Sequence, residues 1–549
     1  RILPFDYKKA LISIFFIIFS TIFEIFTLLI IYTLLSLSGD SSNDNDIVIY
    51  FMKLFTVDSI LLIGLVGVIL KIFFSFMSIK MVANFVYATQ KDISFLLYKG
   101  KMLESYSDYE DSSASGFIRL IGSESQLVIK MIVLPIVSII KELIPTISLF
   151  LMLLLIQPFE SLLLITVLSI LGFIFVLIFS KRVKIWGDER KSVEEEITSD
   201  LLTTDRLFKE ILIYSKQFKF AEKFHIKLKK LSEVSKKQNM IAELPKVILE
   251  VGLYASIIAI LGFFVILDNN INDAIPVIAI IGISALRIIP SVHRATSAAN
   301  NIAFGIPALD LLVTEISKIK KNSLSKDKKE KIACDKLEVK NLGFKREDGN
   351  KIIFQDISFK LTRGMILGIR GESGSGKSTL LYSLAGLLET NSGEVFINDK
   401  KIDQSRIYKD FKVGIVPQQT YIMPGSIFEN VTLRDNETDL NEEKAIEAIR
   451  TSGLSTFLSE FQKGVRQKLA ENSKSISGGQ AQRFSIARLI YKNSDILLLD
   501  EFTSALDKDT KKDLIQEIKK ISKDKIILIS SHTEDVLDMC DEIIDMDKC

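Results

Sequence analysis

One short segment has the composition of a phosphate-binding loop. The strand-like run MILGIR leads into it, and the helix-prone run LLYSLAGLL follows it. Its residues are Gly371, Glu372, Ser373, Gly374, Ser375, Gly376, Lys377, Ser378 and Thr379. Glycines let backbone N–H groups wrap phosphate oxygens, Lys377 can reach the β and γ oxygens of a nucleotide, and Ser378 can bind Mg²⁺. The segment therefore predicts a nucleoside triphosphate site between a strand and a helix.

Two carboxylates follow a second apolar run. Residues 495–501 read DILLLDE, which predicts a buried strand that ends in Asp500 and Glu501. Burial explains the apolar run, but it does not explain two acids at its end. We assign Asp500 to Mg²⁺ through a water molecule and Glu501 to the attacking water, because a carboxylate bound to a metal is a poor base.

A serine and two glycines open a further predicted helix. Ser477, Gly478, Gly479 and Gln480 precede the helix-prone run AQRFSIARLI. The exposed N-terminus of such a helix attracts anions, which favours a second phosphate contact. The same pattern is equally typical of an ordinary helix cap, so both interpretations stay open.

The rest of the chain is too apolar for an ordinary soluble enzyme. Its 549 residues are 48% hydrophobic, and the mean hydropathy is +0.30. The surplus of apolar side chains must face lipid. The net charge of +2 gives no argument for a nucleic-acid partner. Apolar runs long enough to cross about 30 Å of hydrocarbon lie near residues 10–38, 58–79, 130–156, 159–181, 246–267 and 273–295.

The charges between these runs orient the predicted spans. Residues 80–126 and 181–243 are long, charged and rich in Lys, whereas residues 39–46 hold acidic residues and no Lys or Arg. The positive-inside rule places both long loops and both termini in the cytosol. We expect the helices to continue beyond the bilayer as stalks. Residues 47–55 predict either a short amphipathic helix on the outer face or an extension of the second span.

The chain divides into two domains with a charged linker between them. We predict a transmembrane domain over 1–315 with six helices and long cytosolic loops, a linker over 316–336 and a second domain over 337–549. The linker is rich in Lys and Ser, and an alternating strand pattern begins after it. Cys334, Cys540 and Cys549 match neither a disulfide framework nor a zinc site, so we interpret them as reduced cytosolic thiols.

Taken in order, these motifs resemble those of ATP-binding cassette exporters along the whole chain. The resemblance implies an α-helical membrane bundle of six transmembrane helices fused to an α/β P-loop ATP-binding cassette, with ATP and Mg²⁺ as cofactors. It also implies that Gln418 contacts the metal, that His532 contacts the γ-phosphate and that Ser504–Asp507 connects two nucleotide sites. Glu471 resembles the contact that the family makes to the membrane loops. Arg346 stands where the family usually has an aromatic residue that stacks on adenine, which weakens the prediction of base selectivity.

The same resemblance implies a dimer. The family closes each ATP site between the phosphate loop of one cassette and the ISGGQ helix of another, so one chain with one set of motifs needs a partner. Because all motif residues are intact, a homodimer is favoured, with a heterodimer as the alternative. The stretches near Tyr106–Asp111 and Tyr214–Phe220 are expected to dock the cytosolic loops onto the cassettes.

Basic residues at membrane depth predict an anion site. A charged side chain at the centre of a membrane-spanning helix costs about 2.5–3.5 kcal/mol, so its presence there calls for an explanation. The predicted belt consists of Lys71, Lys246, Arg287 and Arg294. The candidate counter-ions are Glu24, Glu142 and Glu250, of which Glu250 has i,i+4 spacing from Lys246. The alternative is that these side chains only snorkel or pair between wet stalk helices.

Two segments make the resemblance more specific, to one subgroup of ATP-binding cassette exporters. ELPKVILEVGLY and ISALRIIPSVHR are similar to the corresponding helices of PglK-type flippases for lipid-linked oligosaccharides in the bacterial inner membrane. That resemblance implies that Lys71, Lys246 and Arg287 receive the pyrophosphate of a polyprenyl-linked glycan. Two of the three are Lys where Arg is expected, which keeps the charge but loses the bidentate fork. Exporters of peptides, lipids or drugs stay open, whereas the intact Glu501 and His532 argue against an inactive binding protein.

Overall fold

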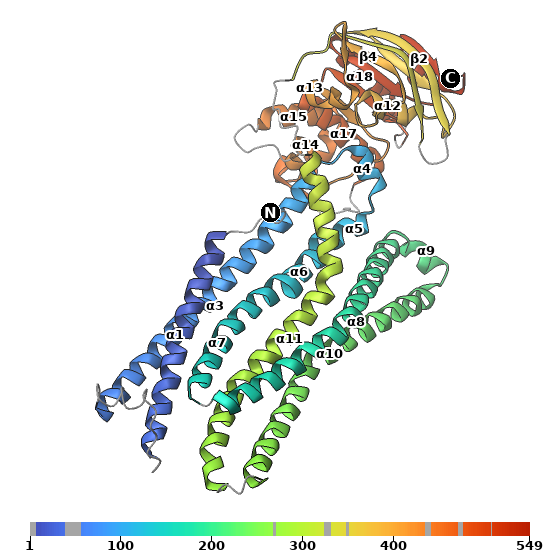
Figure 1. Cartoon of the computed structure of the whole chain (residues 1–549). Coiled ribbons are helices and arrows are strands. Elements are labelled where there is room, and N and C mark those ends of the chain that lie inside the picture. The colour runs from blue at the N-terminus through green and yellow to red at the C-terminus, as the bar shows by residue number, and fades with distance from the viewer. Residues whose placement is uncertain are drawn as a thin grey trace. The chain divides into compact units, whose positions relative to one another are not determined.

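The chain forms two compact units in a computed structural model. The structure describes residues 7–38, 56–156, 158–266, 271–322, 331–346, 351–433, 441–469, 476–504, 506 and 508–548. One unit comprises Arg1–Glu104 and Asp108–Ser325, and the other comprises Ser105–Ser107 and Lys326–Cys549. The first unit is helical and the second is built on β-sheets (Figure 1). The predicted helix at 47–55 lies outside the described residues.

Long helices make up the first unit. Within the described residues they are α1 (Tyr7–Ser38), α3 (Val57–Lys101), α7 (Leu134–Ile156), α8 (Pro158–Arg206), α10 (Gln217–Ile266) and α11 (Ile271–Asn322). The connections contain α4 (Tyr106–Asp111), α5 (Ala114–Arg119), the π-helical turn η1 (Leu120–Glu124), α6 (Ser125–Val128), the π-helical turn η2 (Ile129–Val133) and α9 (Phe208–Ile213). The helices α3, α8, α10 and α11 run far into the charged stretches, and their extension beyond a bilayer as stalks stays a prediction. Two described stretches, Lys8–Thr27 and Asp58–Lys101, are long and apolar enough to span a membrane, so the count of six spans stays a prediction.

Helices α8 and α11 approach each other closely at one glycine. A Cβ atom on Gly187 would lie 2.4 Å from the backbone carbonyl oxygen of Phe304, which is a severe overlap. Backbone atoms cannot rotate away as a flexible side chain can. Gly187 is therefore required by packing between two helices rather than by its own backbone conformation.

Replacing Gly187 with Ala is expected to destabilise the helical unit by about 1–3 kcal/mol, the usual cost of overpacking. Trp186, the one tryptophan of the chain, is the neighbouring residue and reports on this contact by its fluorescence. Gly262→Ala is the matched control, because a Cβ atom there meets nothing within 4 Å. An unfolding midpoint of Gly187→Ala in detergent equal to that of Gly262→Ala would contradict the packing argument.

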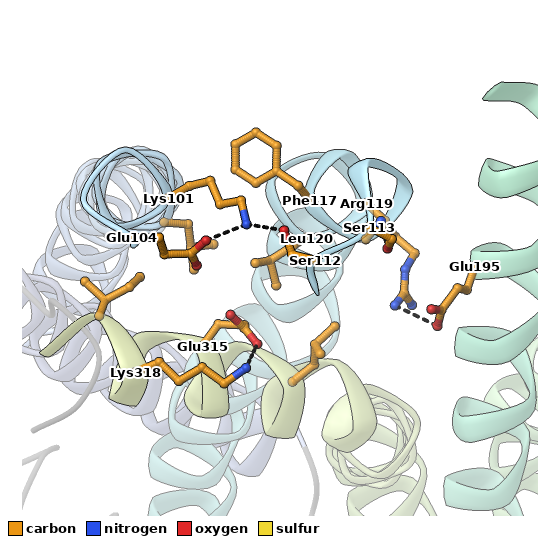
Figure 2. A pocket seen from close by; sticks show the side chains of 14 residues that line it. Lys101, Glu104, Ser112, Ser113, Phe117, Arg119, Leu120, Glu195, Glu315 and Lys318 are labelled. Atoms are coloured by element: carbon orange, nitrogen blue, oxygen red, sulfur yellow. Dashed lines mark hydrogen bonds and ion pairs between the residues drawn. The ribbon is translucent and has the colours of Figure 1, made fainter. Parts of the chain in front are cut away.

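An ion network lies inside the first unit. Glu124, at the end of η1, is fully buried, and its two oxygens accept from Arg119 Nη1 at 3.0 Å and Arg190 Nη2 at 2.9 Å. Arg119 also reaches Glu195 Oε2 at 3.1 Å on α8 (Figure 2), and Arg190 reaches Glu194 Oε2 at 2.6 Å. The network therefore connects the η1 segment to α8. The sequence analysis did not predict it.

Two main sheets make up the second unit. The antiparallel sheet has the order β2-β1-β4-β5, and the parallel sheet has the order β11-β3-β10-β9-β6. The strands are β1 (Lys336–Lys345), β2 (Ile352–Thr362), β3 (Ile366–Arg370), β4 (Ser392–Ile397), β5 (Lys400–Ile402), β6 (Val413–Val416), β9 (Ile496–Asp500), β10 (Ile526–Ser530) and β11 (Glu542–Asp545), with a small pair of β7 (Gly425–Ser426) and β8 (Lys468–Leu469). β9 and β10 are buried throughout, as continuous apolar runs in a parallel sheet should be.

Helices and single turns surround these sheets. They are α12 (Lys377–Leu384), η3 (Gln404–Arg406), α13 (Ile407–Asp410), α14 (Ile427–Thr432), α15 (Glu442–Thr451), α16 (Ser455–Ser459), η5 (Gly464–Arg466), α17 (Gly478–Lys492), α18 (Lys508–Ile521), η6 (Ser522–Asp524), α19 (Glu534–Leu537) and η7 (Met546–Lys548). The helix after the glycine loop is shorter than the run LLYSLAGLL suggested. Gly386 has φ +77° and cannot continue a right-handed helix, so α12 ends at Leu384.

The two described cysteines of the second unit, Cys334 and Cys540, are free thiols in the structure. Cys334 is buried and Cys540 is half-buried. Burial raises the pKa of both thiols to about 12. Both are therefore neutral near pH 7 and poor nucleophiles. Cys549 lies outside the described residues.

Candidate active site

Segments from distant parts of the chain meet around one cavity of about 590 Å³ in the second unit, and three of them follow strands of the parallel sheet. They are the glycine loop after β3, the residue Gln418 after β6 and the residue Glu501 after β9. All three follow carboxyl ends of parallel strands, which is where such sheets bind ligands. The lining consists of Arg346, Lys351, Ile353, Ser373, Gly374, Gly376, Lys377, Ser378, Thr379, Gln418 and Glu501.

The glycine loop has the backbone of an anion cradle. Gly374 and Gly376 have φ +88° and +97°, a region that glycine enters without strain. A Cβ atom on Gly376 would lie 2.5 Å from Ile353 Cγ2, so the close approach to β2 also requires glycine. Lys377 begins α12 and is 5% exposed, and its ammonium donates to the carbonyl oxygens of Gly371 at 2.9 Å and Glu372 at 2.8 Å. The cation is thus held across the loop, where it can exchange a carbonyl for a phosphate oxygen.

Asp500 and Glu501 differ in their surroundings as the sequence suggested. Asp500 is 1% exposed, and its Oδ1 accepts from Ser530 Oγ at 2.6 Å. Its Oδ2 is buried and has no hydrogen-bond partner among the described residues. A buried carboxylate oxygen without a donor fits a bound cation or a water that the cation holds.

Glu501 lies at the centre of the cavity's polar groups. Its Oε2 accepts from Gln418 Nε2 at 2.7 Å, and its Oε1 lies 4.0 Å from Lys377 Nζ and 3.8 Å from His532 Nδ1. The residue has φ +44°, a left-handed conformation that costs about 1–3 kcal/mol for a side chain of this size. Strain at a carboxylate surrounded by Gln418, Lys377 and His532 is typical of a reacting group.

The residues fit Mg²⁺ better than a metal with an all-protein cage. Among the described residues no group of three or more His, Cys, Asp or Glu could hold a metal ion. Mg²⁺ usually keeps several waters and takes only one or two protein ligands beside phosphate oxygens. The Ser378 hydroxyl in the cavity wall and the Asp500 carboxylate are the groups that would hold it, with Gln418 next to them.

The ISGGQ segment forms a helix cap away from this cavity. Ser477 is exposed, its hydroxyl accepts from Gln480 N at 3.2 Å, and Gln480 Oε1 accepts from Ser477 N at 2.9 Å. This capping box begins α17, with Gly478 and Gly479 in its first turn. The cap interpretation is therefore correct, and none of the four residues lines the cavity of its own chain. A contact with phosphate through this segment would require a second chain.

Some of the predicted residues do not line the cavity, and others lie outside the described residues. Glu372 follows Gly371 in the loop without lining the cavity, and its backbone N–H donates to the Asp547 carboxylate. Glu471 and Asp507 lie outside the described residues. Sequence reasoning missed Lys351, although it faces the cavity with Arg346 and its carbonyl oxygen accepts from Arg346 N at 3.0 Å. The turn-like EDGN between these two basic residues was the available signal.

The helical unit contains a second polar cavity of about 400 Å³. Its lining is Ile17, Ser20, Thr21, Glu24, Lys71, Ser75, Ser78, Lys141, Glu142, Pro145 and Arg294. Lys71 Nζ lies 3.6 Å from Glu24 Oε1. Arg294 binds Glu142 with two contacts, Nε to Oε1 at 2.7 Å and Nη2 to Oε2 at 2.9 Å. Two predicted basic residues and two predicted counter-ions therefore meet at one site.

Among the described side chains of the predicted belt, Lys246 does not share this cavity with Lys71 and Arg294. Lys246 is exposed on α10 and does not line this cavity, because its helix is not one of those that enclose it. Among the described side chains, no ion pair within 4.0 Å joins Lys246 to Glu250. The side chain of Arg287 lies outside the described residues. The cavity also includes Lys141, which the sequence analysis did not single out.

Comparison with known proteins identifies the second unit. Residues 354–504 match the family model described as ABC transporter. This segment is an ABC transporter ATP-binding domain. The matched segment includes the glycine loop, Gln418, Ser477 and Glu501, so most of the residues that line the cavity described above belong to this ATP-hydrolysing domain.

Three proteins that are similar to this chain are named for export or translocation. A "Putative export ATP-binding/permease protein" of Rickettsia bellii is 34% identical over 44% of this chain and 42% of its own length. The "Putative multidrug export ATP-binding/permease protein YgaD" of Bacillus subtilis is 29% identical over 53% of this chain and 50% of its own. The "Alpha-hemolysin translocation ATP-binding protein HlyB" of Escherichia coli O157:H7 is 32% identical over 39% and 30%. The matches thus cover half or less of these relatives.

A solved structure extends the similarity beyond the ATP-binding domain to the fold of the whole chain. A bacterial Atm1-family ABC exporter with ATP bound superposes with a TM-score of 0.76 over 98% of this chain and 93% of its own, at 15% sequence identity. At 15% sequence identity, this structural similarity is evidence for the fold alone. The chain therefore has an ABC exporter fold, with a helical N-terminal part and the ATP-binding domain.

One loop segment belongs to the same compact unit as the ATP-binding domain. Ser105–Ser107 cluster with it, and the ring of Tyr106 lies 5.7 Å from the ring of Tyr382 on α12, centroid to centroid, at 66°. Tyr106 is the first residue of the predicted docking stretch, and α12 follows the glycine loop. The second predicted stretch, Tyr214–Phe220, belongs to the helical unit.

Proposed function

We propose that this chain is one half of an ATP-driven exporter that flips a lipid-linked oligosaccharide across a membrane, as a dimer with a second copy of itself. The ATP-binding domain and the exporter fold support the ATP-driven part of this proposal. The names of the similar proteins, which refer to export, agree with it. The bacterial inner membrane is the proposed location, with the ATP-binding domain in the cytosol. The proposed domain limits remain 1–315, 316–336 and 337–549.

The polar cavity of the helical unit carries the substrate assignment. It has three basic side chains, Lys71, Lys141 and Arg294, against two carboxylates, Glu24 and Glu142. The hydroxyls of Ser20, Thr21, Ser75 and Ser78 add further donors. An anionic head group can take over contacts from the carboxylates, because charge-assisted hydrogen bonds to phosphate are as strong as those to carboxylate. An apolar polyprenyl tail would stay in the lipid while the head group occupied the cavity.

The nucleotide chemistry follows from the cavity of the ATP-binding domain. Lys377 neutralises the β and γ oxygens, and the backbone N–H groups of the glycine loop bind the same phosphates. Ser378 and Asp500 would hold Mg²⁺, which would supply positive charge beside the phosphates when bound. Glu501 accepts a proton from the attacking water, and His532 beside it contacts the γ-phosphate.

The ISGGQ segment completes the site from the partner. Ser477, Gly478 and Gly479 offer a capped helix end to the γ-phosphate of the other chain, so ATP binding stabilises the closed dimer and hydrolysis releases it. The energetic requirement is only that ATP binds the closed state more tightly than the open one.

The alternative is export of a peptide, a lipid or a drug. Two similar proteins are named for multidrug export and for α-hemolysin translocation, which favours these substrates. A drug site should be mostly apolar and aromatic. The charged lining of the described cavity agrees better with an anionic head group.

The test is reconstitution of the full chain in liposomes with a polyprenyl-diphosphate glycan. We expect ATP-dependent flipping of the glycolipid, and we expect Lys71→Ala to slow it about tenfold, the loss that goes with one charge-assisted hydrogen bond. Lys80→Ala is the matched control, because Lys80 is exposed on the same helix and does not line the cavity. Flipping that is absent in the wild type, with ATPase activity stimulated by peptides or drugs instead, would overturn the substrate assignment.

A further inference from the structure

A third cavity lies directly beside the polar cavity of the helical unit. It has a volume of about 250 Å³ and shares Arg294 with that neighbour. Its polar lining comprises Lys130, Ser138, His293, Arg294, Ser297 and Asn301. None of the residues that line it is acidic. It is therefore the more cationic of the two cavities. We name it the lower cavity and its neighbour the upper cavity.

The lower cavity differs from a mere gap between paired charges. Another cavity of the helical unit, about 280 Å³, has three basic and three acidic side chains that pair with one another, as Lys101 with Glu104 and Lys318 with Glu315 do (Figure 2). Nothing there calls for a charged ligand. In the lower cavity the nearest carboxylates are Glu142, which binds Arg294, and Glu243, whose Oε2 lies 3.9 Å from His293 Nε2 and whose side chain is 78% exposed.

One imidazole nitrogen of the lower cavity is unsatisfied. His293 Nδ1 is buried and has no hydrogen-bond partner among the described residues. Such a group favours a ligand that supplies the missing partner. Lys246 and Arg294 both lie close enough to His293 to interact with it electrostatically, so the basic residue left out of the upper cavity belongs to the surroundings of the lower one.

The backbone presents Lys130 from an irregular turn. η2 is π-helical, and the N–H of Leu134 donates to the carbonyl oxygen of Ile129, one residue beyond the α-helical distance. Pro135 follows and has no N–H to continue the regular ladder. Single π turns of this kind occur frequently at functional sites, because the extra residue changes the direction of the side chains.

The position of these residues along the chain points to a lipid rather than a solute. Lys130 begins the third predicted span, Lys246 begins the fifth, and Arg294 ends the sixth. With the loops in the cytosol, all three lie at the cytosolic end of their spans, the level of the head groups of the inner leaflet. The phosphate groups of lipids lie at this level.

We propose that the lower cavity is the first binding site for the phosphate group of the transported lipid, which then passes to the upper cavity through Arg294. This inference rests on the proposed function. Lys130 and His293 bind the phosphate at the inner leaflet, with Ser138 and Ser297 as hydroxyl donors. Arg294 contacts it from the same side while still held by Glu142. When the phosphate moves up, Arg294 keeps contact and Lys71 and Lys141 replace Lys130 and His293.

The test measures binding, which does not require transport. The full-length protein in neutral detergent at fixed salt is titrated with a fluorescent short-chain phosphatidic acid. We expect Lys130→Ala and His293→Gln each to weaken the wild-type affinity about tenfold, whereas Lys130→Arg retains it. Lys80→Ala, an exposed lysine that lines neither cavity, should bind as the wild type does. Equal affinity in Lys130→Ala, His293→Gln and the wild type would overturn the proposal.

Two further arms separate the possible sources and outcomes. Displacement of the probe by millimolar inorganic phosphate would show that the cavity recognises the phosphate group alone. If phosphate does not displace the probe but the mutations still weaken its binding, the lipid part is needed as well. Both outcomes support the site. Phosphatidylcholine of the same chain length should not compete, and competition by it would overturn phosphate recognition. If the Lys130→Ala protein flips the glycolipid at the wild-type rate, this inference fails and the proposed function stands. If the wild-type protein flips no glycolipid, the proposed function fails regardless of the binding result.

Discussion

ATP hydrolysis is expected to fall about 100- to 10,000-fold when Glu501 is replaced by Gln, the range that goes with loss of a general base. Gln keeps the size of the side chain, so Gln418 stays within reach of its position, but an amide cannot take a proton from water. Asp500, 1% exposed and bonded to Ser530, is not placed to substitute for it. The measurement is phosphate release by the full-length protein in lipid.

Binding of ATP should survive this change. Lys377 and the glycine loop are untouched, so a fluorescent ATP analogue is expected to bind at least as tightly as to the wild type, and the dimer should accumulate in its closed state. Glu534→Gln is the matched control, because Glu534 is an exposed glutamate two residues after His532 that does not line the cavity. A Glu501→Gln protein that keeps more than a tenth of the wild-type hydrolysis would contradict the assignment of Glu501 as the base.

Local chemistry made the glycine loop and the buried strands around the cavity of the second unit predictable. Gly374 and Gly376 are needed for their φ values, and Gly376 is also needed for the close approach to Ile353. A strand buried on both faces needs a continuous apolar run such as residues 496–499. Each of these requirements acts within a few residues of the chain. The end of α12 is also local, but the positive φ of Gly386 was overlooked in an otherwise apolar run.

Pairings between distant segments could not be predicted in the same way. The sequence named Glu24 and Glu142 as counter-ions, yet Arg294 is 152 residues from Glu142, and no spacing rule indicates which acid meets which base. The lower cavity depends on η2 and α7 meeting α11 around His293, and no sequence pattern singles out this histidine. The π turn at Ile129–Val133, which carries Lys130, was likewise not indicated by any pattern in the sequence.

The Arg119–Glu124–Arg190 network is the strongest example of a missed pairing. Charged residues are expected in cytosolic loops, where most remain solvated, so their number says nothing about burial. Glu124 is fully buried, and the side chains of both arginines are only 4% exposed. Such a group is held in place by the folding of η1 against α8, and only the structure reveals it.

Replacing Glu124 with Ala is expected to destabilise the helical unit by about 3–5 kcal/mol, because two buried guanidinium groups lose their shared counter-ion. The measurement is the free energy of unfolding in denaturant, followed by the fluorescence of Trp186, one turn before Arg190 on α8. Glu196→Ala is the matched control: Glu196 faces solvent and lies 3.5 Å from Lys227, so its loss should cost less than about 1 kcal/mol.

The size of this effect decides whether the network excludes water in the assembled protein. Since Glu124 accepts from both arginines, Arg119→Met and Arg190→Met should each cost less than Glu124→Ala, because each leaves the carboxylate with one partner. Converting all three residues to apolar ones of similar volume should restore much of the stability, since buried ion networks rarely surpass a well-packed apolar core. If Glu124→Ala lowers the free energy of unfolding no more than Glu196→Ala does, water reaches the two arginines. In that case η1 is held to α8 by its apolar contacts alone.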